Sequence, residues 1–350
     1  MKIALIHYRL ILRGGLERRL FNYTNYLLEQ GHEVEVIVAK RSHDAQLPEA
    51  VKVHVLSPGL MPKVFRQRYF DHLLGKFMQQ QNYDLSLSLM RTSHQDLVLC
   101  PGNHLGFLKA MHKKGNRLTD KEQIRCDKAA FRQSRKIIAA SEMMAKELRE
   151  LYHIPQDKIH VLRPPVNLAH FKPGNKVHRD AYRKKYNLPL DKRIFLFISS
   201  SHFRKGLPLL LDCFRQLQDT DAVLVIAGLP PVQSELPNVI DLQYNTQMEE
   251  LYAAADFTIH PARYEPFGQI VPESLSSGTP VIISDTCGAA EVVGPDEGRI
   301  LPATATADWL HTIRNIQTSD FNIPENYAEL HSLSVAEHVE AILAIGKTTY

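Results

Sequence analysis

Short runs rich in β-branched and apolar residues alternate with amphipathic helical stretches along most of this chain of 350 residues. Helices that separate consecutive strands are the crossover connections of parallel sheets, so this alternation predicts an α/β fold. The strands expected in the first half are 2–7, 33–39, 51–56, 83–89 and 136–140, and the helices are 16–30, 64–80 and 142–152.

The same pattern starts again after a break in the middle of the chain. Arg163-Pro164-Pro165 interrupts the periodic segments, and Pro173-Gly174 follows shortly after. The strands expected beyond this break are 193–199, 222–227, 257–260 and 280–284, and the helices are 207–217, 248–255, 270–277 and 335–345. We therefore expect two Rossmann-like domains, 1–168 and 169–332. The pattern allows the last helix to belong to either domain, and we expect the C-terminal helix in 333–350 to join the first. A cleft between two such domains brings the carboxyl ends of both sets of strands to one ligand.

The composition is that of a soluble globular protein, with 44% hydrophobic and 23% charged residues. No apolar run approaches the roughly 18 residues that suggest a transmembrane helix. The apolar part of residues 1–8 is too short for a signal peptide and predicts a strand. The 4 cysteines show no C-x-x-C spacing and no disulfide-dense pattern. A reducing, cytoplasmic location is therefore expected.

The two halves of the chain carry opposite net charges. Residues 1–165 hold 27 Lys and Arg against 16 Asp and Glu, a net charge of +11, whereas the remaining residues hold 15 against 22, a net charge of −7. A basic half predicts an anionic partner, and nucleic acid, a membrane surface and a phosphorylated substrate all stay open.

Two turns between a strand and the next helix have the composition of anion-binding turns. Gly14 and Gly15 open the first helix, where glycines let the backbone approach an anion and the helix end supplies N–H groups. The spacing is neither G-x-G-x-x-G nor a P-loop, so the alternative is an ordinary Gly-Gly turn. Arg204 and Lys205 follow the first strand of the second domain, where both can hold a phosphate. The alternative there is a solvated basic turn.

A third segment, 261–275, places two carboxylates around a glycine-containing turn directly after an expected strand. If the helix begins near Gly268, its N–H groups face an anion, Glu265 stands just outside it, and Glu273 lies more than one turn inside. A carboxylate at that depth is either exposed on one face or reserved for hydrogen bonding. Paired hydroxyls, as on a sugar or a ribose, suit such an acceptor.

The segment from Glu265 to Ile282 resembles the signature of GT-B retaining glycosyltransferases of family 4, which reads roughly E-G-F-G-x-x-x-x-E-A-x-A-x-G-x-P-V. Arg204-Lys205-Gly206 resembles the R-K-G motif of that family, Gly14-Gly15 its glycine-rich first loop, and 161–173 its interdomain segment. Within the family, the chain resembles lipopolysaccharide core glucosyltransferases. The resemblance implies a GT-B fold with a deep interdomain cleft, an acceptor-binding N-terminal domain and a nucleotide-sugar-binding C-terminal domain.

The resemblance also implies roles for individual residues. Glu273 accepts hydrogen bonds from the ribose, Arg204 and Lys205 hold the donor diphosphate, and Glu265 lies on the sugar side. Cations and N–H groups suit this chemistry, because negative charge develops on the leaving phosphate in the transition state. The implied contacts of the nucleotide sugar are Gly14, Gly15, Arg204, Lys205, Glu265, Phe267, Gly268, Gln269, Ile270 and Glu273. The implied catalytic residues are Glu265, Lys205, Arg204 and His104, and no cofactor is expected.

His104 is the candidate for the residue that many family members carry in the N-terminal domain near the acceptor. Asn103 stands beside it, and the alternative is a loop histidine with no role. The chain departs from the family pattern at Pro266 and Pro272 in the signature and at Pro165 and Asn167 in the interdomain segment. These departures leave the start of the signature helix and the conformation of the interdomain loop open.

No metal site is expected. Asp219-Thr220-Asp221 spells D-x-D, but it lies in the turn before an expected strand, away from the carboxyl end, and is interpreted as a solvated turn. The 17 histidines form no H-x-x-x-H spacing.

The basic half has a candidate meaning as a contact with an anionic membrane. In 62–80, basic residues alternate with aromatic and aliphatic ones, and 105–136 adds ten further Lys and Arg. Each basic side chain near an anionic surface contributes about 1 kcal/mol, so several suffice for peripheral docking. The alternative is a helix packed on the core with a solvated basic face.

The sequence therefore favours a retaining glycosyltransferase that moves a hexose from a nucleotide sugar, with UDP-glucose first, to a lipid-linked or lipopolysaccharide-core acceptor. The location expected is the cytoplasmic face of a membrane. A glycosyltransferase with a soluble acceptor, a UDP-sugar epimerase and a non-catalytic sugar-nucleotide-binding protein stay open. A nucleic-acid-binding protein is the weakest alternative, because no reader motif is present.

Overall fold

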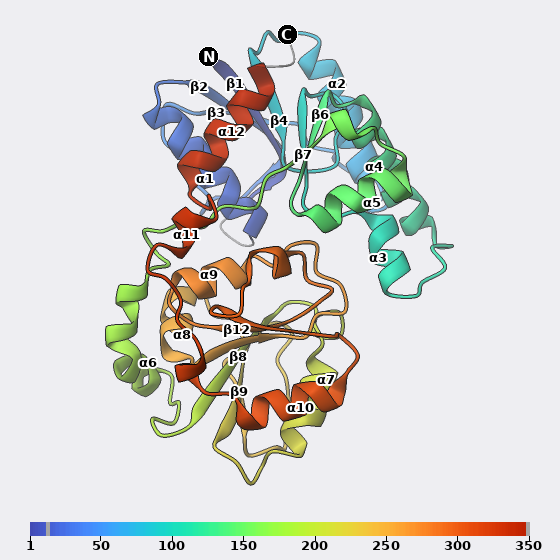
Figure 1. Cartoon of the computed structure of the whole chain (residues 1–350). Coiled ribbons are helices and arrows are strands. Elements are labelled where there is room, and N and C mark those ends of the chain that lie inside the picture. Colours follow the sequence, from blue (N-terminus) through green and yellow to red (C-terminus); the bar gives the residue numbers. More distant parts are fainter. Residues whose placement is uncertain (12–14, 348–350) are drawn as a thin grey trace. The chain divides into compact units, whose positions relative to one another are not determined.

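The computed structural model describes residues 1–11 and 15–347, and within these the chain divides into two compact units (Figure 1). One unit comprises Met1–Pro164 and the segment from Val335 onward, and the other comprises Pro165–Ser334. These bounds differ by a few residues from the expected domains 1–168 and 169–332.

A parallel sheet of seven strands forms the centre of the N-terminal unit, in the order β3-β2-β1-β4-β5-β6-β7. Its strands are β1 Lys2–Leu10, β2 Glu33–Arg41, β3 Lys52–Val55, β4 Leu85–Ser88, β5 Leu97–Cys100, β6 Lys136–Ala139 and β7 Ile159–Val161. Its helices are α1 Gly15–Glu29, α2 Arg66–Met78, α3 His104–Ala110, α4 Leu118–Gln133, α5 Glu142–Tyr152 and α12 Val335–Lys347. The strands that the sequence predicts are present, and β5 and β7 are additional.

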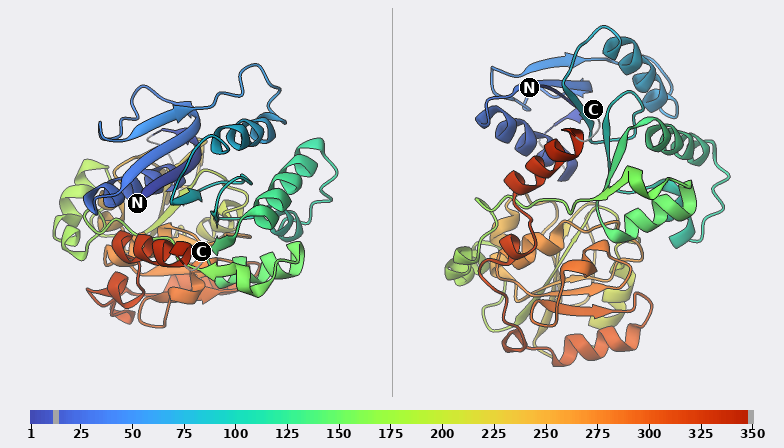
Figure 2. Two further views of the ribbon diagram at one scale, coloured as in Figure 1. Left: turned by 90° about the horizontal axis from the view of Figure 1, so that it is seen from above. Right: turned by 45° about the horizontal axis from the view of Figure 1, so that its top comes forward.

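The C-terminal helix α12 returns to the N-terminal unit, as the sequence predicts, and lies along α1 (Figure 2). Val339, Ile342 and Leu343 join the buried cluster that contains Leu20 and Leu27 of α1. The ring of His338 stacks on Tyr23 with 5.5 Å between centroids. Apolar residues at helical spacing therefore determine where this last segment packs.

A second parallel sheet, of six strands in the order β10-β9-β8-β11-β12-β13, forms the centre of Pro165–Ser334. Its strands are β8 Arg193–Ser199, β9 Ala222–Gly228, β10 Val239–Asp241, β11 Phe257–His260, β12 Val281–Ser284 and β13 Gly298–Leu301. Its helices are α6 Arg179–Lys185, α7 Leu207–Arg215, α8 Met248–Ala254, α9 Ile270–Ser276, α10 Thr306–Asn315 and α11 Tyr327–Leu330. The strand β8 lies between β9 and β11, so the strand order reverses there, where open α/β sheets bind their ligands.

The segment that begins the second unit has a defined conformation despite its departures from the family pattern. Val166 donates its backbone N–H to Leu333, and the side-chain oxygen of Asn167 accepts from the N–H of Ala169 at 3.1 Å. An Asn side chain that accepts from the residue two positions on is a common way to fix a turn. Asn167 therefore supplies a side-chain acceptor that fixes this turn.

Candidate functional site

Three loops meet at the carboxyl edge of the second sheet, after β8, β11 and β12. The N–H of Arg263 donates to the carbonyl of Arg204 at 2.8 Å, which joins the first loop to the second. The N–H of Glu265 donates to Thr286 at 3.1 Å, and Gly288 donates to the carbonyl of Glu265 at 2.8 Å. Backbone hydrogen bonds therefore hold the Arg204-Lys205 turn and the Glu265 turn together as one structure.

Three nitrogen donors surround a single oxygen of Glu265. Its Oε2 lies 3.1 Å from Nη1 of Arg204, 3.7 Å from Nζ of Lys205 and 3.3 Å from Nε2 of His260. The same Nη1 donates to the carbonyl of Tyr264 at 2.7 Å. The structure thus brings together the basic pair and the first carboxylate of the signature, although Arg204 and Glu265 are 61 residues apart in the sequence.

The electrostatics keep this carboxylate ionised. Burial alone would raise the pKa of Glu265, but the charge of Lys205, the hydrogen bond from His260 and the charge of Arg204 hold it well below its ordinary value. Burial lowers the pKa of His260, which is fully buried at the end of β11. A neutral His260 can donate from Nε2 to Glu265, and its buried Nδ1 has no hydrogen-bond partner among the described residues.

His260 is a residue that the sequence analysis missed. It ends an apolar strand, so the sequence pattern is that of a core residue. The only local feature that could have indicated a functional role is a polar side chain at the carboxyl end of a strand. Its hydrogen-bond partner, Glu265, is only five residues further on in the chain. Glu265 in turn contacts Arg204 and Lys205 of a separate loop, which the sequence alone does not bring close.

Two glycines permit the close approach of these loops. Gly206 has φ +88°, and a Cβ there would lie 2.0 Å from the carbonyl oxygen of Pro261. Gly268 has φ +95°, and a Cβ there would lie 2.8 Å from Sγ of Cys287. Both positions therefore require glycine, for its conformation and for its missing side chain.

The turn 267–270 presents its backbone rather than its apolar side chains. The side chains of Phe267 and Ile270 are buried. The amides of Gly268 and Gln269 donate to no acceptor within the described residues. The side chain of Gln269 donates to the carbonyl of Pro165 at 2.8 Å. This turn therefore has N–H groups that are not used by the described part of the chain.

Glu273 lies on the first turn of α9, because the helix begins at Ile270 rather than near Gly268. The expectation that Glu273 lies more than one turn inside the helix is therefore wrong. Pro272 is the third residue of the helix, where a backbone N–H has no partner within the helix and its loss costs nothing. The Glu273 side chain is half-buried, and its Oε2 accepts a hydrogen bond from the hydroxyl of Tyr252 at 2.9 Å. Tyr252 is the second residue that the sequence analysis missed.

In the N-terminal unit, His104 begins α3 at the carboxyl edge of the first sheet. Its Nε2 lies 3.0 Å from Oδ1 of Asp120, and its backbone N–H donates to Asp127 at 2.7 Å. The hydrogen bond from His104 lowers the pKa of Asp120. Asn103 is the N-cap of α3: its side-chain oxygen accepts from the N–H of Gly106 at 2.7 Å. Of the two candidates, Asn103 has a clear structural role, and His104 forms a hydrogen bond with Asp120 within its own unit.

The glycine turn of the first strand lies at the limit of what the structure describes. Gly14 is outside the described residues, and Gly15 is the first residue of α1. Their expected contact with a phosphate stays a prediction.

The two basic segments of the N-terminal unit differ in how they pack: α2 packs on the core, whereas α4 carries an exposed basic stripe. Phe70 and Leu74 of α2 are buried in a core cluster with Ala4 and Ile6 of β1, so the expectation that these apolar side chains lie in a membrane interface is wrong. On α4, four exposed basic residues recur every three or four positions and form the stripe Lys121, Arg125, Lys128 and Arg132. Leu60, in the loop before α2, is fully exposed.

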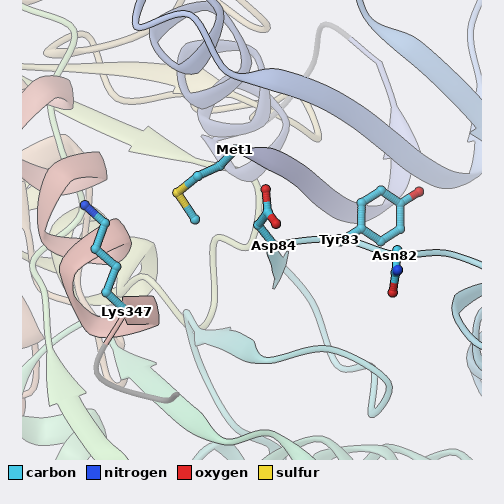
Figure 3. A pocket seen from close by; sticks show the side chains of 5 residues that line it. All are labelled: Met1, Asn82, Tyr83, Asp84 and Lys347. Carbon is cyan, nitrogen blue, oxygen red and sulfur yellow. The ribbon is translucent and has the colours of Figure 1, made fainter.

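Two other features lie away from the carboxyl edges of the sheets. Asp221 of the D-x-D turn accepts from the guanidinium of Arg193 at 2.6 Å, and no cluster of three metal-ligating side chains occurs in the described ranges. A hollow of about 670 Å³ is lined by Met1, Asn82, Tyr83, Asp84 and Lys347, whose side chains are drawn in Figure 3. It lies where β1 and β4 begin, and none of the predicted site residues lines it.

No helix in 1–11 or 15–347 combines the length and the apolar character that are needed to cross a bilayer.

Two family models match the chain. The model described as glycosyl transferases group 1 matches residues 178–329, and the model described as Glycosyltransferase Family 4 matches residues 13–170. A probable transglycosylase of Burkholderia thailandensis is 32% identical over 341 residues, which cover 94% of this chain and 92% of that protein. An uncharacterized glycosyltransferase of Methanocaldococcus jannaschii is 24% identical, over 84% of this chain and 83% of that protein.

Solved glycosyltransferase structures share the fold. WaaG, a glycosyltransferase involved in lipopolysaccharide biosynthesis, superposes with a TM-score of 0.81 and 17% identity, over 98% of this chain and 99% of WaaG. Anabaena HepE in complex with UDP-glucose superposes with a TM-score of 0.74 and 16% identity, over 99% of this chain and 100% of HepE. At these identities the likeness concerns the fold, and the neighbours are GT-B enzymes.

Proposed function

This chain belongs to the GT-B glycosyltransferases of group 1, and we propose that it is a retaining hexosyltransferase that uses a nucleotide sugar. The observation that supports this proposal is the convergence of Arg204, Lys205 and His260 on Glu265 at the carboxyl edge of the second sheet. In the proposed reaction, the two fixed cations stabilise the negative charge and the fixed anion stabilises the positive charge that develop during glycosyl transfer.

Each side chain has a role in the proposed reaction. The bond between the anomeric carbon and the leaving phosphate breaks, and the acceptor oxygen bonds to that carbon on the same face. The proton of the acceptor hydroxyl passes to the leaving phosphate. Arg204 and Lys205 stabilise the negative charge on that phosphate, and the N–H groups of 268–270 assist them. Glu265, held ionised, stabilises the positive charge on the sugar, and Glu273 binds the ribose.

UDP-glucose is the first donor to test, and a lipid-linked or lipopolysaccharide-core sugar is the proposed acceptor. HepE was solved with UDP-glucose, and WaaG takes part in lipopolysaccharide biosynthesis. His104 is the proposed residue of the N-terminal unit near the acceptor. Because the 32% identical relative is called a probable transglycosylase, transfer from an oligosaccharide rather than from a nucleotide sugar is the second candidate.

The test is a binding panel of UDP-, GDP- and ADP-sugars, measured by saturation-transfer NMR and calorimetry. We expect selective binding of one donor, weakened by roughly 10- to 100-fold in Lys205→Ala, because a charge-assisted contact to the diphosphate is lost. Lys184→Ala removes an exposed lysine of α6 and is the matched control. If no nucleotide sugar binds while an oligosaccharide donor reacts, the protein is a transglycosylase and the proposal is wrong.

Peripheral docking to an anionic membrane is the second part of the proposal, and the exposed stripe on α4 supports it together with Leu60. Flotation with vesicles containing phosphatidylglycerol should show binding that decreases with salt. Replacing Lys121, Arg125, Lys128 and Arg132 by Glu should abolish it, since each basic residue contributes about 1 kcal/mol near such a surface. Leu60→Asp should weaken binding at all salt concentrations. Equal flotation of the wild type and the stripe variant would contradict docking through α4.

A further inference from the structure

Tyr252 places a buried hydroxyl against the second carboxylate of the signature. It lies on α8, its side chain is fully buried, and its hydroxyl donates to Oε2 of Glu273 on α9 at 2.9 Å. A hydrogen bond from a neutral donor to a carboxylate is stronger than one between neutral groups, and a buried donor left without its acceptor is costly. The contact therefore fixes both groups.

The segment that begins the second unit and the end of α9 hold Tyr252 in turn. The ring of Phe171 meets the Tyr252 ring edge-on, with 5.7 Å between centroids. The backbone carbonyl of Tyr252 accepts from the hydroxyl of Thr279 at 2.7 Å and from Nζ of Lys176 at 3.3 Å. The same Nζ donates to the carbonyl of Ala255 at 2.6 Å. Both the ring and the backbone of Tyr252 are thus fixed, so its hydroxyl has little freedom to follow a moving carboxylate.

We propose that Tyr252 is a positioning residue that orients the Glu273 carboxylate for the ribose of the donor nucleotide. This inference rests on the proposed function, in which Glu273 binds the ribose. A carboxylate offers about four acceptor positions, so it can accept from one tyrosine hydroxyl and also from ribose hydroxyls. Because the side chain of Glu273 has several rotatable bonds, fixing one of its oxygens defines where the other acceptor positions point.

The contact between Tyr252 and Glu273 also gives the segment 171–176 a role in the proposed site. Phe171 and Lys176 hold Tyr252, and Tyr252 holds Glu273. The part of the chain that leads into the second unit is therefore connected to the ribose position through one aromatic residue.

The test compares nucleotides with and without ribose hydroxyls. Calorimetry measures the binding of UDP, GDP and ADP, each beside its 2′,3′-dideoxy analogue, to the wild type and to Tyr252→Phe. For the nucleotide that binds, we expect Tyr252→Phe to lower affinity roughly tenfold, and to leave the affinity for the dideoxy analogue unchanged. Tyr327→Phe is the matched control, because it removes a buried hydroxyl of the same unit that donates to a carbonyl, that of Val292.

Several results would overturn the inference. If Tyr252→Phe weakens the binding of the nucleotide and of its dideoxy analogue equally, the hydroxyl has only a structural role. If it weakens the binding of neither, the contact with Glu273 does not contribute to binding. Glu273→Ala separates this from the proposed function: a ribose-dependent loss in Glu273→Ala without one in Tyr252→Phe contradicts only the role of Tyr252. If Glu273→Ala lowers the affinity for the nucleotide and for its dideoxy analogue equally, Glu273 does not bind the ribose. If the wild type binds no nucleotide, both the proposed function and the role of Tyr252 are contradicted.

Phe171→Leu provides a second variant should Tyr252→Phe unfold. It removes the edge contact on the ring and leaves the hydroxyl, so a smaller loss that again depends on the ribose hydroxyls is expected. A loss of equal size on the dideoxy analogue would contradict the proposal here as well.

Discussion

The carboxyl edges of the two sheets are both lined by polar residues, but those residues have different partners. In the second unit, Arg204 and Lys205 of the loop after β8 and His260 at the end of β11 meet on Glu265. In the N-terminal unit, Asn103 caps its own helix, and His104 pairs with Asp120 of the next one. The first arrangement concentrates charge between loops, whereas the second mainly holds helices in place. Polar residues after a strand therefore indicate a reaction site most clearly when their partners come from separate loops.

Replacing Glu265 should have the largest effect. With Glu265→Gln, we expect the turnover number to fall by about 10²–10³-fold, because a preorganised charge beside the reacting sugar is lost. Donor binding should change little, since Arg204 and Lys205 remain. Initial rates at saturating donor measure this, and Glu235→Gln, in the loop between β9 and β10, is the control. A turnover number within a few fold of the wild type would place the chemistry elsewhere.

Acid should destabilise the N-terminal unit through His338. Burial lowers the pKa of His338 to about 3, with a smaller contribution from the charge of Arg19. The unfolded chain therefore binds a proton below about pH 6.5 that the folded chain does not, so stability is full above that pH and decreases toward pH 3. At pH 4.5 the loss is about 2–3 kcal/mol.

His338→Phe should flatten this pH dependence while keeping the ring on Tyr23. Unfolding in urea followed by circular dichroism reports both units, whereas fluorescence of Trp309, the only tryptophan, reports the second unit. We expect His338→Phe to change the pH dependence of the transition followed by circular dichroism, and to leave that of the Trp309 fluorescence unchanged. An identical pH dependence in the wild type and the variant would contradict the assignment.

His104 tests whether the N-terminal edge takes part in catalysis. With His104→Ala, we expect the catalytic efficiency to fall about tenfold, less than for Glu265, because a general acid–base or contact role is worth at least that much. Asp120→Asn is the comparison variant, because it keeps a hydrogen-bonding side chain beside His104 and removes the negative charge. A loss of thermal stability without a change in rate would make His104 a structural residue like its neighbour.

The smallest effect is expected at Asn103. Asn103→Ala should lower the free energy of unfolding by about 1 kcal/mol, because α3 loses its N-cap. Asn103→Ser should recover part of that loss, since a serine hydroxyl also caps a helix. A rate loss in both variants at unchanged stability would instead make Asn103 a site residue.

The sequence predicted the long apolar elements and missed the ones that depend on distant partners. Strands such as 193–199 and helices such as 142–152 appear with the expected bounds. The helix α4 was missed because Glu122 and Asp127 are buried in it, which breaks the apolar pattern. Their burial depends on Arg68 and Arg91, which come from other parts of the chain.

The site shows the same division. Arg204, Lys205, Glu265 and Glu273 stand in motifs whose spacing is visible along the chain. His260 and Tyr252 were missed, because a histidine ending an apolar strand and a tyrosine on a short helix are typical core residues. Their roles depend on contacts with Glu265 and Glu273 that form only in the folded unit.

A crystal structure of the protein with bound UDP-glucose would locate the donor site directly. We expect the diphosphate to lie against Arg204, Lys205 and the backbone of 268–270, with the ribose hydroxyls on Glu273. A nucleotide bound in the hollow beside Met1 and Lys347, or at any site away from the Glu265 loops, would contradict it.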